Sequence, residues 1–198
     1  MDLNFKNLNL IEDTIDKESI RLIKENFSSF PFHWESSTRE IFPYYSHRLI
    51  CRDETINETT PYKPTSKLLP FFYDIMHGFC QKHDIVYKNI IRACLNNTYH
   101  IPNYEYQDPH LDAKVNHLIV IIYLNNSHGN TVIFDKVFDP ITKITQYNVE
   151  DIVNHFDILA EIPPKEGKIV CFSGKYFHTI RSPLPGEHRS ICIFNLLL

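Results

Sequence analysis

Glycine is scarce in this sequence, and runs of basic residues and CxxC pairs do not occur in it. Only 5 of the 198 residues are glycine, whereas 14 are phenylalanine and 11 are tyrosine. This balance argues against a flexible, low-complexity chain and favours a β-rich core, because aromatic residues suit strands. The hydrophobic content of 43% is ordinary for a globular protein. We therefore expect a single domain over residues 1–198.

The charge pattern excludes other classes of protein. The formal net charge is −4, whereas nucleic-acid binding needs a clustered basic surface, so we expect no nucleic-acid partner. The longest apolar run, Leu118–Leu124, is far shorter than the roughly 20 residues of a membrane-spanning helix, so we expect no membrane partner. Residues 1–19 lack the basic and apolar regions of a signal peptide.

The cysteines are odd in number and irregularly spaced. The chain contains Cys51, Cys80, Cys94, Cys171 and Cys192. This pattern indicates reduced thiols rather than a disulfide framework. We expect a cytoplasmic location, which would be the host cytoplasm for a viral protein.

The first half of the chain, residues 1–89, is predicted to be a mixed helical layer that supports a sheet. Residues 1–15 are interpreted as a polar lead-in. A helix is predicted from the N-cap Asp16 to Phe27, and a second from Ser66 to about His83, because both segments carry apolar residues at helical spacing. Residues 44–50 are predicted to form a strand.

The second half, residues 90–198, changes to a strand pattern. The predicted strands are Ile90–Tyr99, Val115–Asn125, Thr131–Phe134, Ile169–Phe172 and Ile191–Phe194. Residues 135–162 are ambiguous, and Val149–Phe156 fits either a helical turn or an insertion hairpin. Short strands separated by turn signals favour a mainly β, α+β domain built on a jelly-roll or cupin-like barrel.

Pairs of a histidine and an acidic residue with one residue between them are the first candidates for a metal site. There are three: His33-Trp-Glu35, His110-Leu-Asp112 and His155-Phe-Asp157. About one is expected by chance, so context must distinguish them. His33 precedes the strand-rich half, and His155 is only 23 positions before His178. The pair at 110–112 follows a turn, precedes the longest apolar strand and lies well upstream of His178.

His110, Asp112 and His178 have the chemistry of a non-haem iron site. Two imidazoles and one carboxylate bind Fe(II) and leave coordination positions open. Alternate residues of an extended segment share a face, so the H-x-D spacing directs both side chains the same way. Arg189 follows His178 by eleven positions and offers a planar fork for a carboxylate. The alternatives are an ordinary loop pair at 110–112 and a surface arginine at 189.

The order of these motifs resembles the 2-oxoglutarate- and Fe(II)-dependent oxygenases of the prolyl 4-hydroxylase type. The resemblance covers roughly residues 90–198 and is greatest to the small single-domain members of bacteria and phages. The matching elements are His110-Leu-Asp112, Ile121-Ile-Tyr-Leu-Asn125, Gly129-Asn-Thr-Val-Ile-Phe134, His178 and Arg189.

The resemblance implies a double-stranded β-helix catalytic core and a role for each matching residue. His110, Asp112 and His178 would bind Fe(II), and Arg189 would pair with the distal carboxylate of the cosubstrate, 2-oxoglutarate. Tyr123 would donate its hydroxyl to the same carboxylate, and Thr131 would line the cosubstrate site. The alternative for Tyr123 is a core aromatic on the barrel wall.

The implied activity is hydroxylation by O2 with release of succinate and CO2, and with ascorbate as a reductant. The substrate would be a peptidyl side chain such as proline, or a small amino-acid-like metabolite. Asn195 stands where the DNA-repair branch has a second arginine, which counts against nucleobase demethylation. Two alternatives are a non-catalytic jelly-roll module that retains the metal site and a cupin-type enzyme without 2-oxoglutarate. Arg189 disfavours both, because neither needs a carboxylate clamp.

Overall fold

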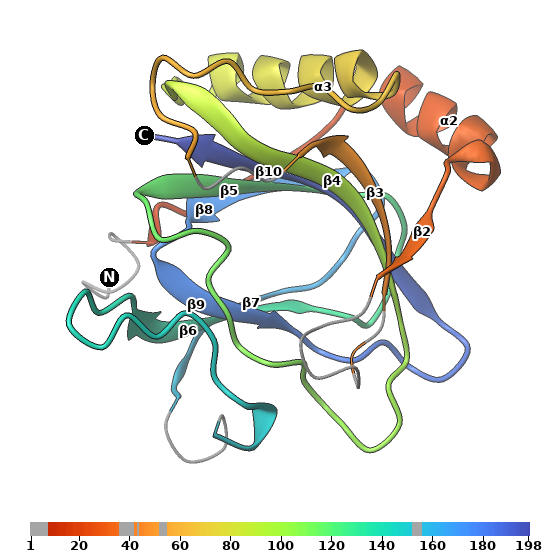
Figure 1. Ribbon diagram of the computed structural model, residues 1–198. Coiled ribbons are helices and arrows are strands. Elements are labelled where there is room, and N and C mark those ends of the chain that lie inside the picture. Colours follow the sequence, from red (N-terminus) through yellow and green to blue (C-terminus); the bar gives the residue numbers. More distant parts are fainter. Residues whose placement is uncertain (1–7, 36–41, 43, 52–54, 152–155) are drawn as a thin grey trace.

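Two antiparallel sheets face each other in the computed structural model, which describes residues 8–35, 42, 44–51, 55–151 and 156–198 (Figure 1). The large sheet contains, in spatial order, β1 (Ile11–Thr14), β8 (Lys168–Ser173), β5 (His117–Tyr123), β10 (His188–Leu197), β4 (Asn89–Tyr99), β3 (Tyr44–Ile50) and β2 (His33–Glu35). The small sheet contains β7 (Ile158–Ile162), β6 (Thr131–Val137) and β9 (Tyr176–Ile180). The predicted double-stranded β-helix fold is confirmed.

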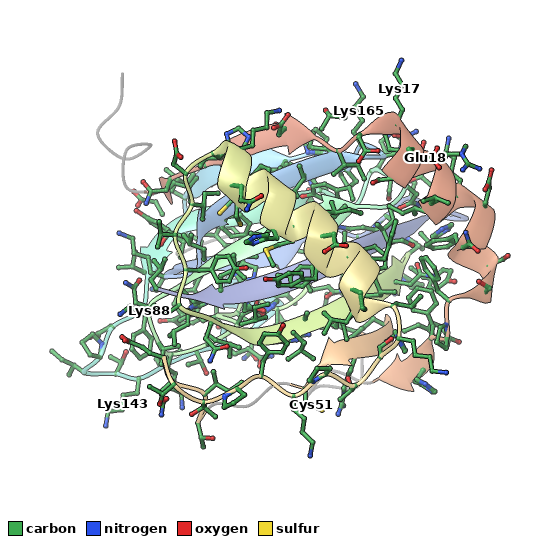
Figure 2. All side chains as sticks on the ribbon, turned by 90° about the horizontal axis from the view of Figure 1, so that it is seen from above. Lys17, Glu18, Cys51, Lys88, Lys143 and Lys165 are labelled. Atoms are coloured by element: carbon green, nitrogen blue, oxygen red, sulfur yellow. The ribbon has the colours of Figure 1, made fainter. Side chains whose placement is uncertain are left out.

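Two helices cover the outer face of the large sheet, and α3 lies across its strands in Figure 2. Helix α2 (Lys17–Asn26) begins where the sequence predicts, because the Asp16 carboxylate accepts a hydrogen bond from the Ser19 amide at 2.8 Å. Helix α3 (Leu69–Lys82) packs its apolar face on the sheet and buries Phe72 and Met76 completely. No helix in the described ranges is long and apolar enough to cross a bilayer.

The prediction that Ser66 caps the second helix is wrong. Helix α3 starts at Leu69 and has no side-chain cap. The Ser66 hydroxyl instead lies 2.7 Å from His47 Nε2 on β3, and it accepts the Leu68 amide at 3.1 Å. Pro70 lies in the first turn of α3. A backbone N–H at this position would have no partner within the helix, so proline costs no hydrogen bond there.

Two further expectations need correction, and one ambiguous region is now described. Residues 11–14, interpreted as lead-in, form β1 and pair with β8, so the first half of the chain contributes edge strands as well as helices. Strand β5 is shorter than the predicted 115–125. The ambiguous region 135–162 contains β7 and a 3-10 turn, η2 (Val149–Asp151), while residues 152–155 lie outside the described residues. A second 3-10 turn, η1 (Phe27–Ser29), ends α2.

The inner face of the large sheet supplies the wall of the candidate site. All seven residues of β5 are buried, because helices cover one face of the sheet and the small sheet covers the other. On β10, Arg189 is opposite Thr98 of β4, and Asn195 is opposite Arg92. Because alternate residues share a face, these side chains project into the barrel from one continuous surface.

Gly174 connects β8 to β9, and it lets the chain pass directly over the buried His117 ring. A Cβ at residue 174 would lie 2.2 Å from His117 Nε2, and the ring is held by its Nδ1 hydrogen bond to the Val115 carbonyl at 2.8 Å. We expect Gly174→Ala to lower the free energy of unfolding by about 1–3 kcal/mol through overpacking. Gly78→Ala in the exposed middle of α3 is the control and should raise it by about 0.5–1 kcal/mol. Urea unfolding measures both, and equal effects would contradict this account.

Candidate metal centre

A backbone pairing between a loop and a strand brings the three predicted metal ligands together. His110 and Asp112 lie in the connection between β4 and β5, and His178 lies on β9. The His110 amide donates to the His178 carbonyl at 2.9 Å, and the His178 amide donates back to the His110 carbonyl at 3.1 Å. This isolated antiparallel bridge places both imidazoles side by side, with ring centroids 4.7 Å apart.

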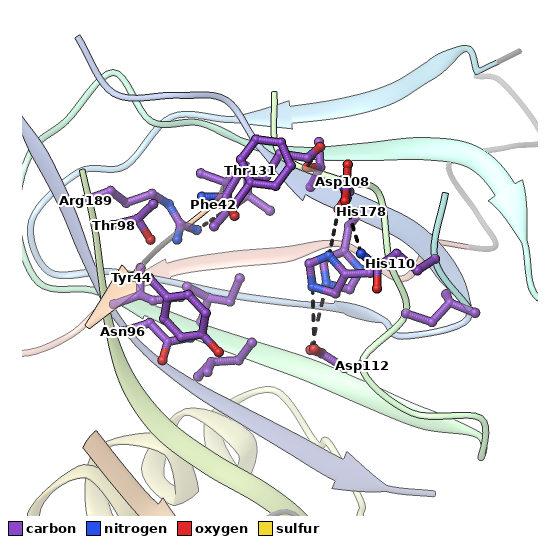
Figure 3. Close-up of a pocket in the computed structure, with 18 of the residues that line it drawn as sticks. Phe42, Tyr44, Asn96, Thr98, Asp108, His110, Asp112, Thr131, His178 and Arg189 are labelled. Carbon is purple, nitrogen blue, oxygen red and sulfur yellow. Dashed lines mark hydrogen bonds and ion pairs between the residues drawn. The ribbon is translucent and has the colours of Figure 1, made fainter. Parts of the chain in front are cut away.

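The three side chains converge on one point, and dashed lines in Figure 3 join both imidazoles to Asp112. The nearest ligand atoms, Nε2 of His110 and Nε2 of His178, each lie 3.8 Å from an Asp112 carboxylate oxygen. That separation is too long for a hydrogen bond. All three ligand atoms lie within 4.8 Å of one another, and no other such group occurs among the described residues. The space between them is suited to a metal ion.

Both imidazoles present a free Nε2 lone pair to this space. The Nδ1 atom of His110 lies 3.1 Å from the Asp108 carbonyl, and that of His178 lies 3.2 Å from the Tyr176 carbonyl. A carbonyl can only accept, so Nδ1 carries the proton and Nε2 is left to bind a metal. Burial, with help from the neighbouring His110, lowers the pKa of His178 to about 4, so this ring is neutral at neutral pH.

Asp112 is held as a buried anion by two side chains from the inner face of the large sheet. The Asn195 amide donates to Oδ2 at 2.9 Å, and a guanidinium nitrogen of Arg92 lies 3.3 Å from Oδ1. Burial by itself would raise the pKa of Asp112, but His178, Arg92 and His110 outweigh burial and hold it below its usual range. The carboxylate is therefore ionised and oriented before any ligand binds.

Arg189 is a buried cation at another part of the same site. Its side chain is 1% exposed, and one terminal nitrogen donates to the Thr131 hydroxyl at 2.6 Å. Its Nε and other terminal nitrogen have no hydrogen-bond partner among the described residues. Burial lowers the pKa of Arg189, since the charged form is poorly solvated there. A guanidinium with unused buried donors is suited to an anionic ligand.

One cavity of about 360 Å³ connects the two groups. His110, Asp112 and His178 line one part of it, and Arg189 and Thr131 line another (Figure 3). This volume is within the range of small-molecule sites. The cavity thus joins the candidate metal-ligand group to the buried guanidinium of Arg189.

Tyr123 lies beside Thr131 and Arg189. It is fully buried and is not among the residues that line the cavity. Its hydroxyl lies 2.7 Å from the Thr131 hydroxyl, and its ring lies 5.5 Å from the Arg189 guanidinium. The role predicted for Tyr123, donation to a bound carboxylate, stays a prediction. Thr131 is the hydroxyl that reaches the cavity, and Tyr123 supports it from behind.

Two residues that hold Asp112 were not predicted from the sequence to do so. Asn195 shares strand parity with Arg189, which is a signal that it faces the same cavity. Arg92 has no such signal, because only the register between β4 and β10 places it beside Asn195. Of the other two histidine–acid pairs, His33 lies on the edge strand β2, and His155 lies outside the described residues.

Comparison with known proteins supports the fold assignment. No family model and no curated protein matches the sequence. Among solved structures, a 2-oxoglutarate-Fe(II) oxygenase family oxidoreductase from Burkholderia pseudomallei is 14% identical with a TM-score of 0.61, and the match covers 98% of this chain and 86% of that one.

Two further solved structures differ in what they bind. A prolyl hydroxylase from Trichoplax adhaerens, in complex with a hypoxia inducible factor peptide fragment, is 10% identical with a TM-score of 0.59, and the match covers 98% of this chain and 85% of that one. HygX from Streptomyces hygroscopicus, with nickel and 2-oxoglutarate bound, is 8% identical with a TM-score of 0.59. The match covers 97% of this chain and 84% of that one. At these identities the likeness establishes the fold of 2-oxoglutarate oxygenases.

We expect the unpaired charge of Arg189 to lower the free energy of unfolding of the protein. We expect Arg189→Met to raise the free energy of unfolding of the ligand-free protein by about 1–3 kcal/mol, because a buried cation with unused donors becomes an apolar side chain. Arg181→Met is the matched control, since Arg181 is partly exposed and paired with Glu105 and Glu161. That change should lower stability by about 1 kcal/mol or less. Greater destabilisation by Arg189→Met than by the control would contradict the analysis.

Proposed function

We propose that this protein is an Fe(II)- and 2-oxoglutarate-dependent oxygenase. The observation that carries the proposal is the shared cavity of the facial triad and Arg189. Two neutral imidazoles and one carboxylate are the donor set of non-haem Fe(II) sites that keep open positions. An acidic cosubstrate would account for the unused donors of Arg189. A metal site that binds no such cosubstrate would not need a buried cation beside it.

Each residue has a defined task in this proposal. His110, Asp112 and His178 would hold the metal, and bound Fe(II) would supply the activation of O2. Arg189 would donate hydrogen bonds to the distal carboxylate of 2-oxoglutarate, with the Thr131 hydroxyl beside it. Tyr123 would act through Thr131, whose hydroxyl it orients. The buried walls would exclude water from the reaction.

The proposed reaction is hydroxylation. One oxygen atom of O2 enters the product hydroxyl and the other enters succinate, as 2-oxoglutarate loses CO2. The substrate would be a peptidyl side chain, such as proline, or a small amino-acid-like molecule. Support for a peptide or a small-molecule substrate comes from proteins of the same fold, one solved with a peptide fragment and another with hygromycin B.

An anaerobic titration with Fe(II) and then 2-oxoglutarate tests the proposal. We expect a saturable visible charge-transfer band from the chelate, and we expect His178→Ala and Asp112→Ala to abolish it, because a triad reduced to two ligands binds Fe(II) poorly. His128→Ala is the matched control, since His128 is exposed and paired with Glu187. Folded, metal-loaded protein that gives no band would sink the proposal and favour a non-catalytic barrel.

The role of Arg189 is tested by a different property of the same band. Arg189→Ala should still bind iron, but it should weaken 2-oxoglutarate by about 10- to 100-fold, as expected for loss of a charge-assisted pair. Thr131→Val should weaken it less, because a neutral hydroxyl contributes less than a cation. Titration of the band intensity gives both constants. Unchanged 2-oxoglutarate affinity in Arg189→Ala would remove the clamp from the proposal.

A further inference from the structure

Arg92 is a second cation of the cavity, and it lies far from Arg189. Arg92 is opposite Asn195 on β10, whereas Arg189 lies on β10 itself, six residues earlier. At about 3.4 Å per residue the two backbone positions are about 20 Å apart. Both side chains line the cavity. The two side chains thus enter the cavity from well-separated backbone positions, and each can serve a different anion.

The one ion pair of Arg92 within the described part of the chain is weak. Its nitrogen lies 3.3 Å from Asp112 Oδ1, which is longer than a normal charge-assisted hydrogen bond. Its side chain also interacts with the Cys94 thiol, but a guanidinium has five N–H donors, and these two partners do not use all of them. The side chain is 18% exposed, and it lines both this cavity and a second pocket beside Ser46 and Cys94.

Among the described residues that line the cavity, the acidic groups leave Arg92 without a full counter-ion once the proposed ligands are bound. Asp112 would share its charge with the metal, and Arg189 would pair with the cosubstrate. The remaining acid, Asp108, accepts the Val149 amide at 2.8 Å and the Gln146 amide at 3.2 Å. The charge of Arg92 remains, beside a metal ligand, where a substrate must bind to react.

We propose that Arg92 determines substrate specificity by binding a carboxylate of the primary substrate. This inference rests on the proposed oxygenase function and narrows it to organic acids. The planar fork of Arg92 suits a carboxylate better than a neutral amide. Because Arg92 and the metal share Asp112, the oxidised C–H bond is a near neighbour of that carboxylate. The product is a hydroxy acid, formed with one O2 and one 2-oxoglutarate consumed and one succinate and one CO2 released.

Matched acids and amides test this directly. Protein loaded with Fe(II) and 2-oxoglutarate is supplied with free L-amino acids, C3–C6 carboxylic acids, or the corresponding primary amides, and succinate release is measured. A third set holds blocked peptides with aspartate or glutamate side chains. We expect at least one acid to stimulate succinate release about 10-fold or more over its amide, because charged hydrogen bonds discriminate by that amount.

Two variants separate recognition from support of the metal ligand. Arg92→Gln and Asn195→Ala each remove one contact to Asp112, so both should weaken Fe(II) binding. Arg92→Gln should also lose the preference for acid over amide, whereas Asn195→Ala should keep it at saturating iron. A role confined to holding Asp112 would leave the preference unchanged in both variants.

Each outcome either supports or overturns the role of Arg92. Stimulation by free acids supports a small-molecule substrate, and stimulation only by the acidic peptides supports the carboxylate and assigns it to a side chain. A normal chelate band with equal stimulation by amides, or with no stimulation by any acid, overturns the role of Arg92 and leaves the oxygenase proposal standing. Loss of the band in the wild type overturns both.

Discussion

The reciprocal backbone pairing of His110 with His178 is the contact on which the candidate site depends. These two hydrogen bonds join the connection after β4 to the small sheet, and they set two imidazoles beside each other. A side-chain cluster alone would not hold this geometry, because the 3.8 Å between each imidazole Nε2 and Asp112 is too long for a hydrogen bond. The position of Asp112 follows, since it is two residues beyond a fixed backbone.

The large sheet supports this pairing from the opposite wall. Asn195 and Arg92 come from neighbouring strands in register, and between them they hold both oxygens of Asp112. Arg189 comes from the same strand as Asn195, so one strand positions both the metal carboxylate and the anion clamp. The separation of these groups is therefore fixed by the rise of β10 and not by a flexible loop.

Much of the site could be predicted from sequence, because its signals are local. The H-x-D pair, a distal histidine in an apolar run and a following arginine are each recognisable without knowing strand register. The role of Tyr123 was predicted from the resemblance, but its contact with the Thr131 hydroxyl depends on how β6 approaches β5. Arg92 lies 20 residues before Asp112 in the sequence, and no local pattern links them.

The elements that were mispredicted have physical causes of the same kind. Strand β1 is four residues long and carries Glu12 and Asp13, so its sequence indicates a polar lead-in, and its pairing comes from the edge of β8. Ser66 has the residue type of an N-cap, yet a tertiary contact with His47 uses its hydroxyl. In both cases a partner distant in sequence outweighs a local preference.

The pairing at the metal centre also closes a loop that runs from residue 110 to residue 178. Bringing such distant segments together costs chain entropy, and in a small metal-dependent domain the ion itself must offset that cost. Here the strands of both sheets and their apolar core close the loop without it. The cost of closing this loop is therefore shared by the packing of the whole barrel, and a metal bound at the centre would add to that packing.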